Sequence, residues 1–214
     1  VMLGLNGSQN PFSGTPTYRS IEHLPLDQRV EAMSQPDIRA KILSEDPVKQ
    51  STFPLIHRIL FAQMFRLGSP ANYTPSPEES ISAMAQNLGV TPQEMAYDIL
   101  LENQGREFIY APLVNYADYT MDACAEMLDD PYSIMGLGDG GAHVGFILDA
   151  GYPTWLISYW NQKQKRYSVE ETVRRLTSDT AKAVGLFDRG RIAVGLKADF
   201  NVIDWSSVRA GDPY

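Results

Sequence analysis

The sequence SIMGLGDGGAH, residues 133–143, decides the fold prediction because a short apolar run breaks there into glycines around one acidic side chain. Ile134, Met135 and Leu137 can supply a short buried strand. Glycines on both sides of Asp139 allow a sharp turn and a close approach of the backbone to a ligand. In a barrel of parallel strands, the residues at the carboxyl ends of the strands meet the substrate. We therefore predict an α/β enzyme in which Asp139 is the catalytic carboxylate.

Length, composition and charge indicate a globular protein and exclude several partners. The chain has 214 residues, 43% of them hydrophobic, and it contains no apolar run long enough to span a bilayer. Its formal net charge of −8 argues against a surface that binds nucleic acid. The single cysteine, Cys124, excludes an internal disulfide and favours a reducing compartment, and its apolar neighbours predict a buried position on a helix. We expect a soluble, cytoplasmic protein with neither nucleic acid nor membrane as a partner.

Helix start and stop signals alternate with short extended segments along the chain. Pro36 divides the helical stretch between Leu26 and Ser44 into two helices. Residues 76–79 (SPEE) and 91–94 (TPQE) each combine an N-cap, a proline at the first helical position and a capping-box glutamate. Their helices are expected to end at glycines, and the second carries its apolar side chains into a core. Further helices are expected over 120–129 and 168–185, the latter opened by a third capping box, and extended segments over 1–5 and 108–113.

One region departs from this regular alternation. The stretch from Asp46 to Asn72 mixes aromatic rings with prolines and shows no clean periodicity. Irregular chain between regular elements is typical of a lid or an excursion over a site. We therefore predict a lid-like excursion around residues 20–90.

The end of the sequence carries a recognisable pattern. Residues 177–186 read TSDTAKAVGL and residues 188–204 read DRGRIAVGLKADFNVID. This pattern resembles the closing segment of the amidohydrolase superfamily, in which a Gly-x-Lys-Ala-Asp stretch leads from the last barrel helix into a small β-sandwich. The resemblance implies an α/β fold: the carboxyl-terminal part of a (β/α)₈ TIM-type barrel over residues 1–188, with part of the β-sandwich over residues 189–214.

The same resemblance extends to the acidic motif. The Asp-Gly-x-x-His spacing of residues 139–143 looks like that of the N-acyl-D-amino-acid deacylase (D-aminoacylase) branch, although Gly138 stands where related proteins often have serine. The resemblance implies a hydrolase of carbon–nitrogen bonds other than peptide bonds, with one or two divalent metals, usually zinc. Asp139 is then the proton shuttle and a contact of the metal, and His143 binds the substrate or the developing oxyanion. An aspartate that caps a turn, and a histidine bound to a backbone carbonyl, are the structural alternatives.

The sequence lacks the metal-binding signature expected at the other end of such a barrel. The superfamily uses a His-x-His pair on its first strand, and this chain contains no His-x-His. His23 and His57 have no second ligand at helical or hairpin spacing. Because a complete barrel needs about 250 residues, we expect most metal ligands outside this chain, in a remaining portion of the same enzyme that completes the barrel around Asp139.

Alternatives to a linear-amide hydrolase stay open at this point. A cyclic-amide hydrolase of the dihydropyrimidinase type would share the closing segment and the aspartate. A metal-free, non-catalytic subunit is the other alternative, since folds of this kind survive the loss of their metals. Ser8, Asn10 and the Tyr18-Arg19 pair are lesser candidates for contacting a substrate carboxylate, and ordinary turn chemistry explains them equally well. Tyr116 and Tyr119 are further loop candidates.

Overall fold

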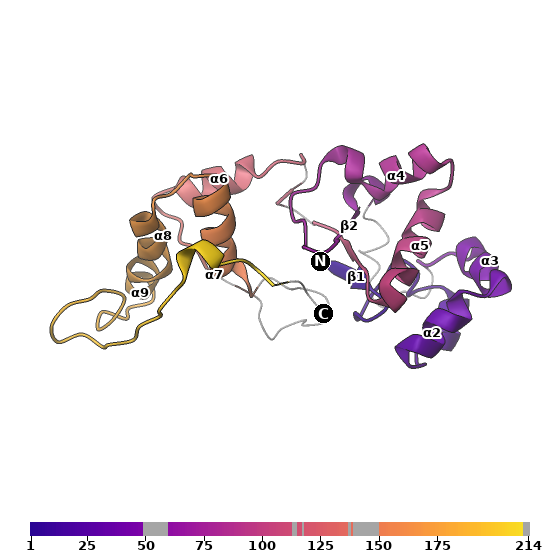
Figure 1. The fold of residues 1–214 in the computed structure, drawn as a ribbon, viewed down its shortest axis with the longest axis horizontal. Coiled ribbons are helices and arrows are strands. Elements are labelled where there is room, and N and C mark those ends of the chain that lie inside the picture. Colours follow the sequence, from indigo (N-terminus) through magenta and orange to yellow (C-terminus); the bar gives the residue numbers. More distant parts are fainter. Residues whose placement is uncertain (49–59, 113–114, 117, 137, 139–149, 212–214) are drawn as a thin grey trace. The chain divides into compact units, whose positions relative to one another are not determined.

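Two compact units make up the described part of the chain (Figure 1). Unit 1 comprises the described residues up to Met121, and unit 2 comprises those from Asp122 onward. The division into barrel and β-sandwich at residues 188 and 189 stays a prediction. The computed structural model describes residues 1–48, 60–112, 115–116, 118–136, 138 and 150–211.

A three-stranded antiparallel sheet lies at the centre of unit 1. Its strands are β1 (Met2–Gly4), β2 (Phe65–Arg66) and β3 (Phe108–Tyr110), in the order β1-β3-β2. Leu3 is the register partner of Ile109, and both side chains are fully buried. The extended segments predicted for residues 1–5 and 108–113 are thus confirmed over residues 2–4 and 108–110. The neighbouring strands run antiparallel, whereas barrel strands run parallel.

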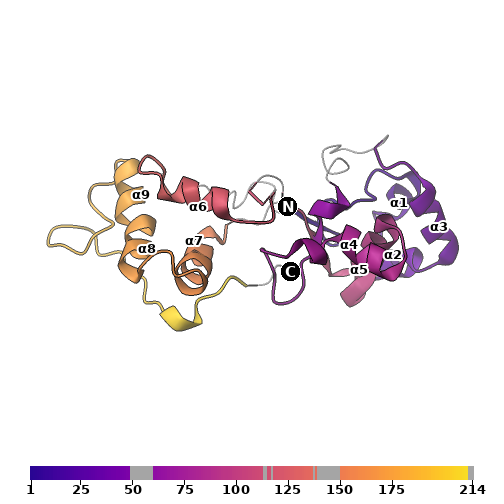
Figure 2. The same ribbon diagram turned by 90° about the horizontal axis from the view of Figure 1, so that it is seen from above.

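Three short helices follow β1, and prolines set their boundaries. Thr15 caps α1 (Pro16–Ile21), where it accepts a hydrogen bond from the Tyr18 amide. The predicted division at Pro36 is confirmed: α2 (Leu26–Met33) ends, and α3 (Pro36–Ser44) begins at the proline, where no backbone donor is needed. Figure 2 shows α1 next to α3, on which it packs.

Two of the three predicted capping boxes are complete, but they open different structures; at Ser168 only the N-cap half is present. The Thr91 box opens α5 (Pro92–Gly105): the Glu94 amide donates to Thr91 Oγ1 at 3.2 Å, and the Thr91 amide donates to Glu94 Oε2 at 2.8 Å. The Ser76 box opens only the 3₁₀ turn η3 (Pro77–Glu79). Ser80 then caps α4 (Ile81–Leu88), so the predicted helix begins one turn later than expected.

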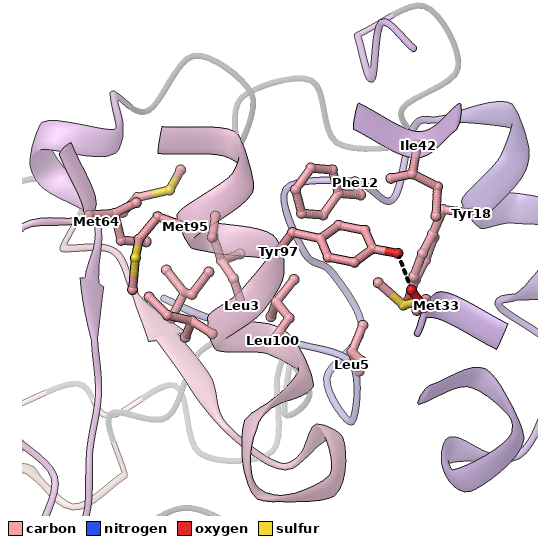
Figure 3. Close-up of a cluster of buried hydrophobic side chains, with 14 of the residues drawn as sticks. Leu3, Leu5, Phe12, Tyr18, Met33, Ile42, Met64, Met95, Tyr97 and Leu100 are labelled. Atoms are coloured by element: carbon pink, nitrogen blue, oxygen red, sulfur yellow. Dashed lines mark hydrogen bonds between the residues drawn. The ribbon is translucent and has the colours of Figure 1, made fainter. Parts of the chain in front are cut away.

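Tyr97 of α5 lies within the hydrophobic core of unit 1 (Figure 3). Its hydroxyl donates to the Met33 carbonyl at 2.8 Å, and its ring meets Phe12 edge to face at 5.4 Å. Burial raises the pKa of Tyr97 to about 12. The residues around it come from all of unit 1: Leu3, Leu5, Phe12, Tyr18, Met33, Ile42, Met64, Ile81, Met95, Ile99, Leu100 and Ile109.

The lid-like excursion predicted around residues 20–90 provides much of this same core. Met33, Ile42 and Ile81 each expose no more than 1% of their surface, and they pack with residues of β1 and α5. These three residues are therefore part of the hydrophobic interior, whereas most other described residues of the region are exposed or half-buried. The segment 49–59 lies outside the described residues. After this segment, the 3₁₀ turn η2 (Phe61–Gln63) is followed by β2.

The described part of unit 2 is helical and contains no strand. Ser168 caps the predicted helix by accepting a hydrogen bond from the Glu171 amide at 3.1 Å, and the helix breaks in two at Thr177. The strand expected near residues 134–136 is replaced by turns and irregular chain. The elements are α6 (Asp122–Asp129), α7 (Tyr152–Trp155), the π-helix η4 (Leu156–Lys163), α8 (Val169–Leu176), α9 (Ser178–Ala183) and the 3₁₀ turn η5 (Trp205–Ser207).

The strand expected after Gly195 is also absent from the described residues. Phe200 and Val202 are largely exposed on irregular chain. A strand needs a neighbour that accepts and donates its backbone hydrogen bonds. Residues 189–211 have no such neighbour in the described structure, which explains why the β-prone sequence stays unpaired here. No helix among the described residues combines the length and the apolar character that crossing a membrane requires.

Two glycines, Gly89 at the end of α4 and Gly105 at the end of α5, give a test of packing. Gly105 and Gly89 both adopt positive φ, at 79° and 70°. A Cβ on Gly105 lies 2.5 Å from Val30 Cγ2, whereas a Cβ on Gly89 meets nothing within 4 Å. We expect Gly89→Ala to lower the free energy of unfolding by about 1–2 kcal/mol through backbone strain. We expect Gly105→Ala to lower it by about 1–3 kcal/mol more, since Val30 must move.

Urea unfolding followed by far-ultraviolet circular dichroism measures both variants. Equal losses for Gly105→Ala and Gly89→Ala would contradict the close packing at Gly105.

Candidate active site

The two residues predicted to carry the chemistry, Asp139 and His143, lie outside the described residues. The structure describes the chain on either side of them, up to Gly138 and again from Ala150. Both flanks belong to unit 2. The surroundings of the predicted site can therefore be built from these flanks.

The approach to Asp139 differs from the buried strand that the sequence predicts. Ile134 is 52% exposed, and no strand is present in the described residues of this segment. After α6, a turn forms in which the Tyr132 amide donates to Asp130 Oδ1 at 2.7 Å and the Ser133 amide donates to the Asp130 carbonyl at 3.1 Å. The prediction of a buried strand is wrong for Ile134, because no neighbouring strand of unit 2 is present among the described residues to cover it.

Gly138 is closely packed, in contrast to the residues before it. A Cβ at this position lies 3.0 Å from Cδ1 and 3.1 Å from Cε1 of Tyr152, and 3.2 Å from the Cα of Ala150. These distances are shorter than ordinary van der Waals contacts. A serine at 138, the residue often expected there, therefore requires a shift of the Tyr152 ring or of the backbone.

Tyr152 begins a helical stretch that changes its hydrogen-bond pattern. The four residues of α7 lead directly into the π-helix η4, a rare form that often occurs at functional sites. Trp155 stacks on Tyr159 with ring centroids 4.5 Å apart, and Lys163 Nζ lies 5.5 Å from the centre of the Tyr159 ring. The aromatic pair thus spans the junction of α7 and η4, on the chain that follows the predicted site.

A groove of about 990 Å³ lies beside these helices within unit 2. Its basic side chains are partly neutralised: Arg174 pairs with Asp179 at 3.1 Å, and Lys197 pairs with Asp188 at 3.3 Å. Arg191 makes no ion pair within the described part of the chain. Apolar side chains form most of the rest of the wall, among them Tyr152, Ile157, Val173, Leu176, Phe200 and Ile203.

An ionic cluster ties α6 to α8 in the same unit. Arg166 and the Tyr167 hydroxyl both donate to the carboxylate of Asp129, the latter at 2.8 Å. The Arg175 guanidinium lies 4.2 Å from the centre of the Tyr167 ring and donates to the Leu128 carbonyl at 2.6 Å. The hydrogen bonds from Arg166 and Tyr167 lower the pKa of Asp129. This cluster fixes the helix that precedes the segment carrying the predicted site.

The comparison with known families decides the broad identity of the chain. The model of the Amidohydrolase family matches residues 2–213. The chain belongs to the amidohydrolase family. No curated protein and no solved structure matches the chain.

Membership in the amidohydrolase family confirms the coarse part of the sequence interpretation. Amidohydrolases are metal-dependent hydrolases with small-molecule substrates, and their fold is of the TIM-barrel kind. The family match does not distinguish the D-aminoacylase branch, the substrate or the identity of the metal. These finer assignments stay predictions.

Amidohydrolases usually bind divalent metals, and the described residues of this chain do not form such a site by themselves. Among them, no group of three or more His, Cys, Asp and Glu side chains is placed to hold a metal ion. His23 is exposed in the turn after α1. Cys124 is half-buried, and burial raises the pKa of its thiol, which disfavours the thiolate that binds metals. His57 lies outside the described residues, as do Asp139 and His143.

Four of the lesser candidates, Asn10, Tyr18, Tyr116 and Tyr119, have structural roles. Asn10 is buried, and its Oδ1 accepts from the Phe12 amide at 2.9 Å, as turn chemistry predicts. Tyr18 is part of the unit 1 core. The hydroxyls of Tyr116 and Tyr119 donate to the backbone carbonyls of Pro75 and Ala62.

A second groove, of about 640 Å³, lies in unit 1 and is lined in part by Phe12, Ile42, Glu45 and Met64. The Glu45 carboxylate is already engaged, because it accepts from the amide and the hydroxyl of Thr17 at 2.8 Å and 2.5 Å. A carboxylate with two such donors is held in place and serves to join α3 to α1.

The Asp129 cluster predicts a pH dependence of unit 2. Because the folded-state pKa of Asp129 is lowered, its contribution to stability is present above its unfolded pKa and is lost as the pH falls through the folded value. We expect Asp129→Asn to lower the free energy of unfolding at pH 7 by about 1 kcal/mol or less, since the cluster is partly exposed. At pH 3 and below, the difference from the wild type should shrink.

Tryptophan fluorescence during urea unfolding reports this unit, because Trp155, Trp160 and Trp205 all lie in it. Glu126→Gln on the same helix is the control, because Glu126 is exposed and forms no ion pair within the described residues. A difference between Asp129→Asn and wild type that stays constant from pH 7 to pH 3 would argue against the assigned pKa direction.

Proposed function

We propose that this amidohydrolase hydrolyses the linear amide of N-acyl-D-amino acids and releases a carboxylate and the free amino acid. The observation that carries this proposal is the Asp-Gly-Gly-Ala-His sequence of residues 139–143, in a chain that matches the family from residue 2 to residue 213. Its spacing resembles that of the D-aminoacylase branch. The groove of unit 2 supports a substrate that has both an apolar group and an anionic group, since most of its wall is apolar and Arg191, which makes no ion pair within the described residues, lies on it.

Asp139 is the proposed proton shuttle. Its carboxylate takes a proton from the attacking water as the carbon–oxygen bond forms. It then delivers that proton to the amide nitrogen as the carbon–nitrogen bond breaks, so that the leaving group departs as a neutral amine. The general acid–base role needs a carboxylate within hydrogen-bond reach of both atoms, which a turn rich in glycine permits.

The proposed metal is zinc, with one or two ions in contact with Asp139. A bound divalent ion supplies a water of lowered pKa, about 7, as the nucleophile. The described residues offer no further set of ligands, and the sequence contains no His-x-His pair. We therefore propose that most ligands come from a portion of the same enzyme outside this sequence, which would also supply the parallel strands of the barrel.

His143 is the proposed substrate-binding residue. An imidazole N–H can donate a hydrogen bond to the carbonyl oxygen as it becomes an oxyanion. His143 stands four positions after Asp139 in the sequence. The single cysteine, half-buried in α6, favours a reducing compartment, and we propose the cytoplasm.

A substrate panel on the full enzyme tests this proposal. Replacement of Asp139 by Asn removes the titrating oxygen at nearly constant size. We expect kcat for N-acetyl-D-amino acids to fall on the order of 10²–10⁴-fold. Asp130→Asn is the matched control, since Asp130 is exposed and accepts a turn hydrogen bond from the Tyr132 amide.

The panel includes N-acetyl-L-amino acids and hydantoins, with metal content measured in parallel. Ring opening of hydantoins without cleavage of the linear amides would assign the protein to the cyclic-amide hydrolases instead. An intact enzyme that binds no metal and cleaves none of these substrates would indicate the non-catalytic subunit. Unchanged turnover in Asp139→Asn would overturn the proton-shuttle role.

A further inference from the structure

Asn6 lies in the bend that follows β1, and it is the only asparagine of the sequence that precedes a glycine. It is exposed, and its side chain makes no hydrogen bond within the described part of the chain. An amide side chain that is neither buried nor hydrogen-bonded is free to turn toward the backbone that follows it. The first backbone group that it meets there is the amide of Gly7.

The Gly7 amide is weakly protected against a reaction with that side chain. It donates to the Gly4 carbonyl at 3.3 Å, beyond the usual range of about 2.7–3.2 Å for an N–H···O hydrogen bond. Because glycine has no Cβ, no side-chain atom of residue 7 shields its own nitrogen. The chain itself holds this nitrogen close to Cγ of Asn6, and such proximity favours an intramolecular attack that closes a five-membered ring.

We propose that Asn6 is a modification site at which the protein deamidates spontaneously. The Gly7 nitrogen forms a bond to Asn6 Cγ, the bond between Cγ and Nδ2 breaks, and ammonia leaves with the proton of the Gly7 amide. Water then opens the cyclic imide at either of its two carbonyl carbons. Opening at Cγ yields aspartate at position 6, and opening at the main-chain carbonyl carbon yields isoaspartate, whose main chain runs through Cγ.

The two products differ in what they do to unit 1. The aspartate adds a negative charge at an exposed position and leaves the main chain unchanged. The isoaspartate adds a carbon atom to the main chain between Gly4 and Gln9, where the Gly4 amide donates to the Gln9 carbonyl at 2.9 Å. Neither reaction needs a metal, a cofactor or Asp139, so the inference is independent of the proposed function.

The end of β1 has little room for a longer chain. Gly4 is the register partner of Phe108, and a Cβ on Gly4 would lie only 2.7 Å from Phe108 Cδ1. Leu5 is buried, and its carbonyl accepts from Arg29 Nη1 at 2.8 Å. We therefore expect the isoaspartate form to be less stable than the aspartate form, because the added atom must be absorbed beside these packed residues.

Incubation of the full enzyme at mildly alkaline pH, followed by peptide mapping with tandem mass spectrometry, tests the inference. Deamidation exchanges an amide for a carboxyl group, and the resulting mass shift locates the modified residue. Asn201 is the control inside the same molecule, because it is exposed on irregular chain but precedes the β-branched Val202. We expect Asn6 to deamidate at least about tenfold faster than Asn201, which corresponds to about 1.4 kcal/mol in activation free energy.

Gly7→Ala tests the part played by the Gly7 nitrogen. Gly7 is not among the glycines with positive φ, so alanine can take its backbone conformation, while the added Cβ hinders approach to the nitrogen. The deamidation rate at Asn6 should then fall by about tenfold, toward that of Asn201. A rate at Asn6 no higher than that at Asn201, or a rate that Gly7→Ala leaves unchanged, would overturn the proposed site.

Asn6→Asp reproduces the aspartate product directly and so separates the added charge from the longer main chain. The isoaspartate form, isolated by chromatography after incubation, is melted beside this variant. We expect its thermal midpoint to lie at least about 2 °C below that of Asn6→Asp. Equal midpoints would overturn the effect on β1, and aspartate as the sole product would overturn the opening at the main-chain carbonyl carbon.

Discussion

A β-strand can be buried only when another strand satisfies its backbone hydrogen bonds, and this requirement separates the two units of the chain. In unit 1, β3 lies between β1 and β2, so Leu3, Phe65 and Ile109 are fully covered. The core around Tyr97 is built on this small sheet. In the described part of unit 2 no strand is present, and helices joined by ionic and aromatic contacts hold the unit together.

Local signals in the sequence predicted the helices well, because capping is a short-range effect. The Thr91 and Ser76 boxes and the break at Pro36 depend on residues within one helical turn of each other. The partner of a β-strand can lie far away in the sequence, so local patterns do not show whether a strand has one. The strand predicted near Ile134 was wrong for this reason. The segment at Ile134 has an apolar composition typical of a buried strand, yet Ile134 is exposed, since no described strand lies beside it.

In the candidate site, too, features formed by neighbouring residues could be predicted from the sequence, and contacts between distant residues could not. The glycines around Asp139 could be found in the sequence, as could the family resemblance that the match over residues 2–213 bears out. The contact between Gly138 and Tyr152 could not be found, because fourteen positions of chain separate the two residues and no periodic pattern connects them. The ionic cluster on Asp129 was missed for a similar reason: its partners lie on other elements.

The unpaired segment near Phe200 and Val202 has a consequence for the behaviour of the molecule in concentrated solution. Its apolar side chains are exposed, and its irregular backbone has no strand partner among the described residues, so it can associate with a like segment of another molecule. The formal net charge of −8 opposes such encounters through mutual repulsion. Dissolved salt screens this repulsion and leaves the apolar attraction in place, so colloidal stability should decline as ionic strength rises.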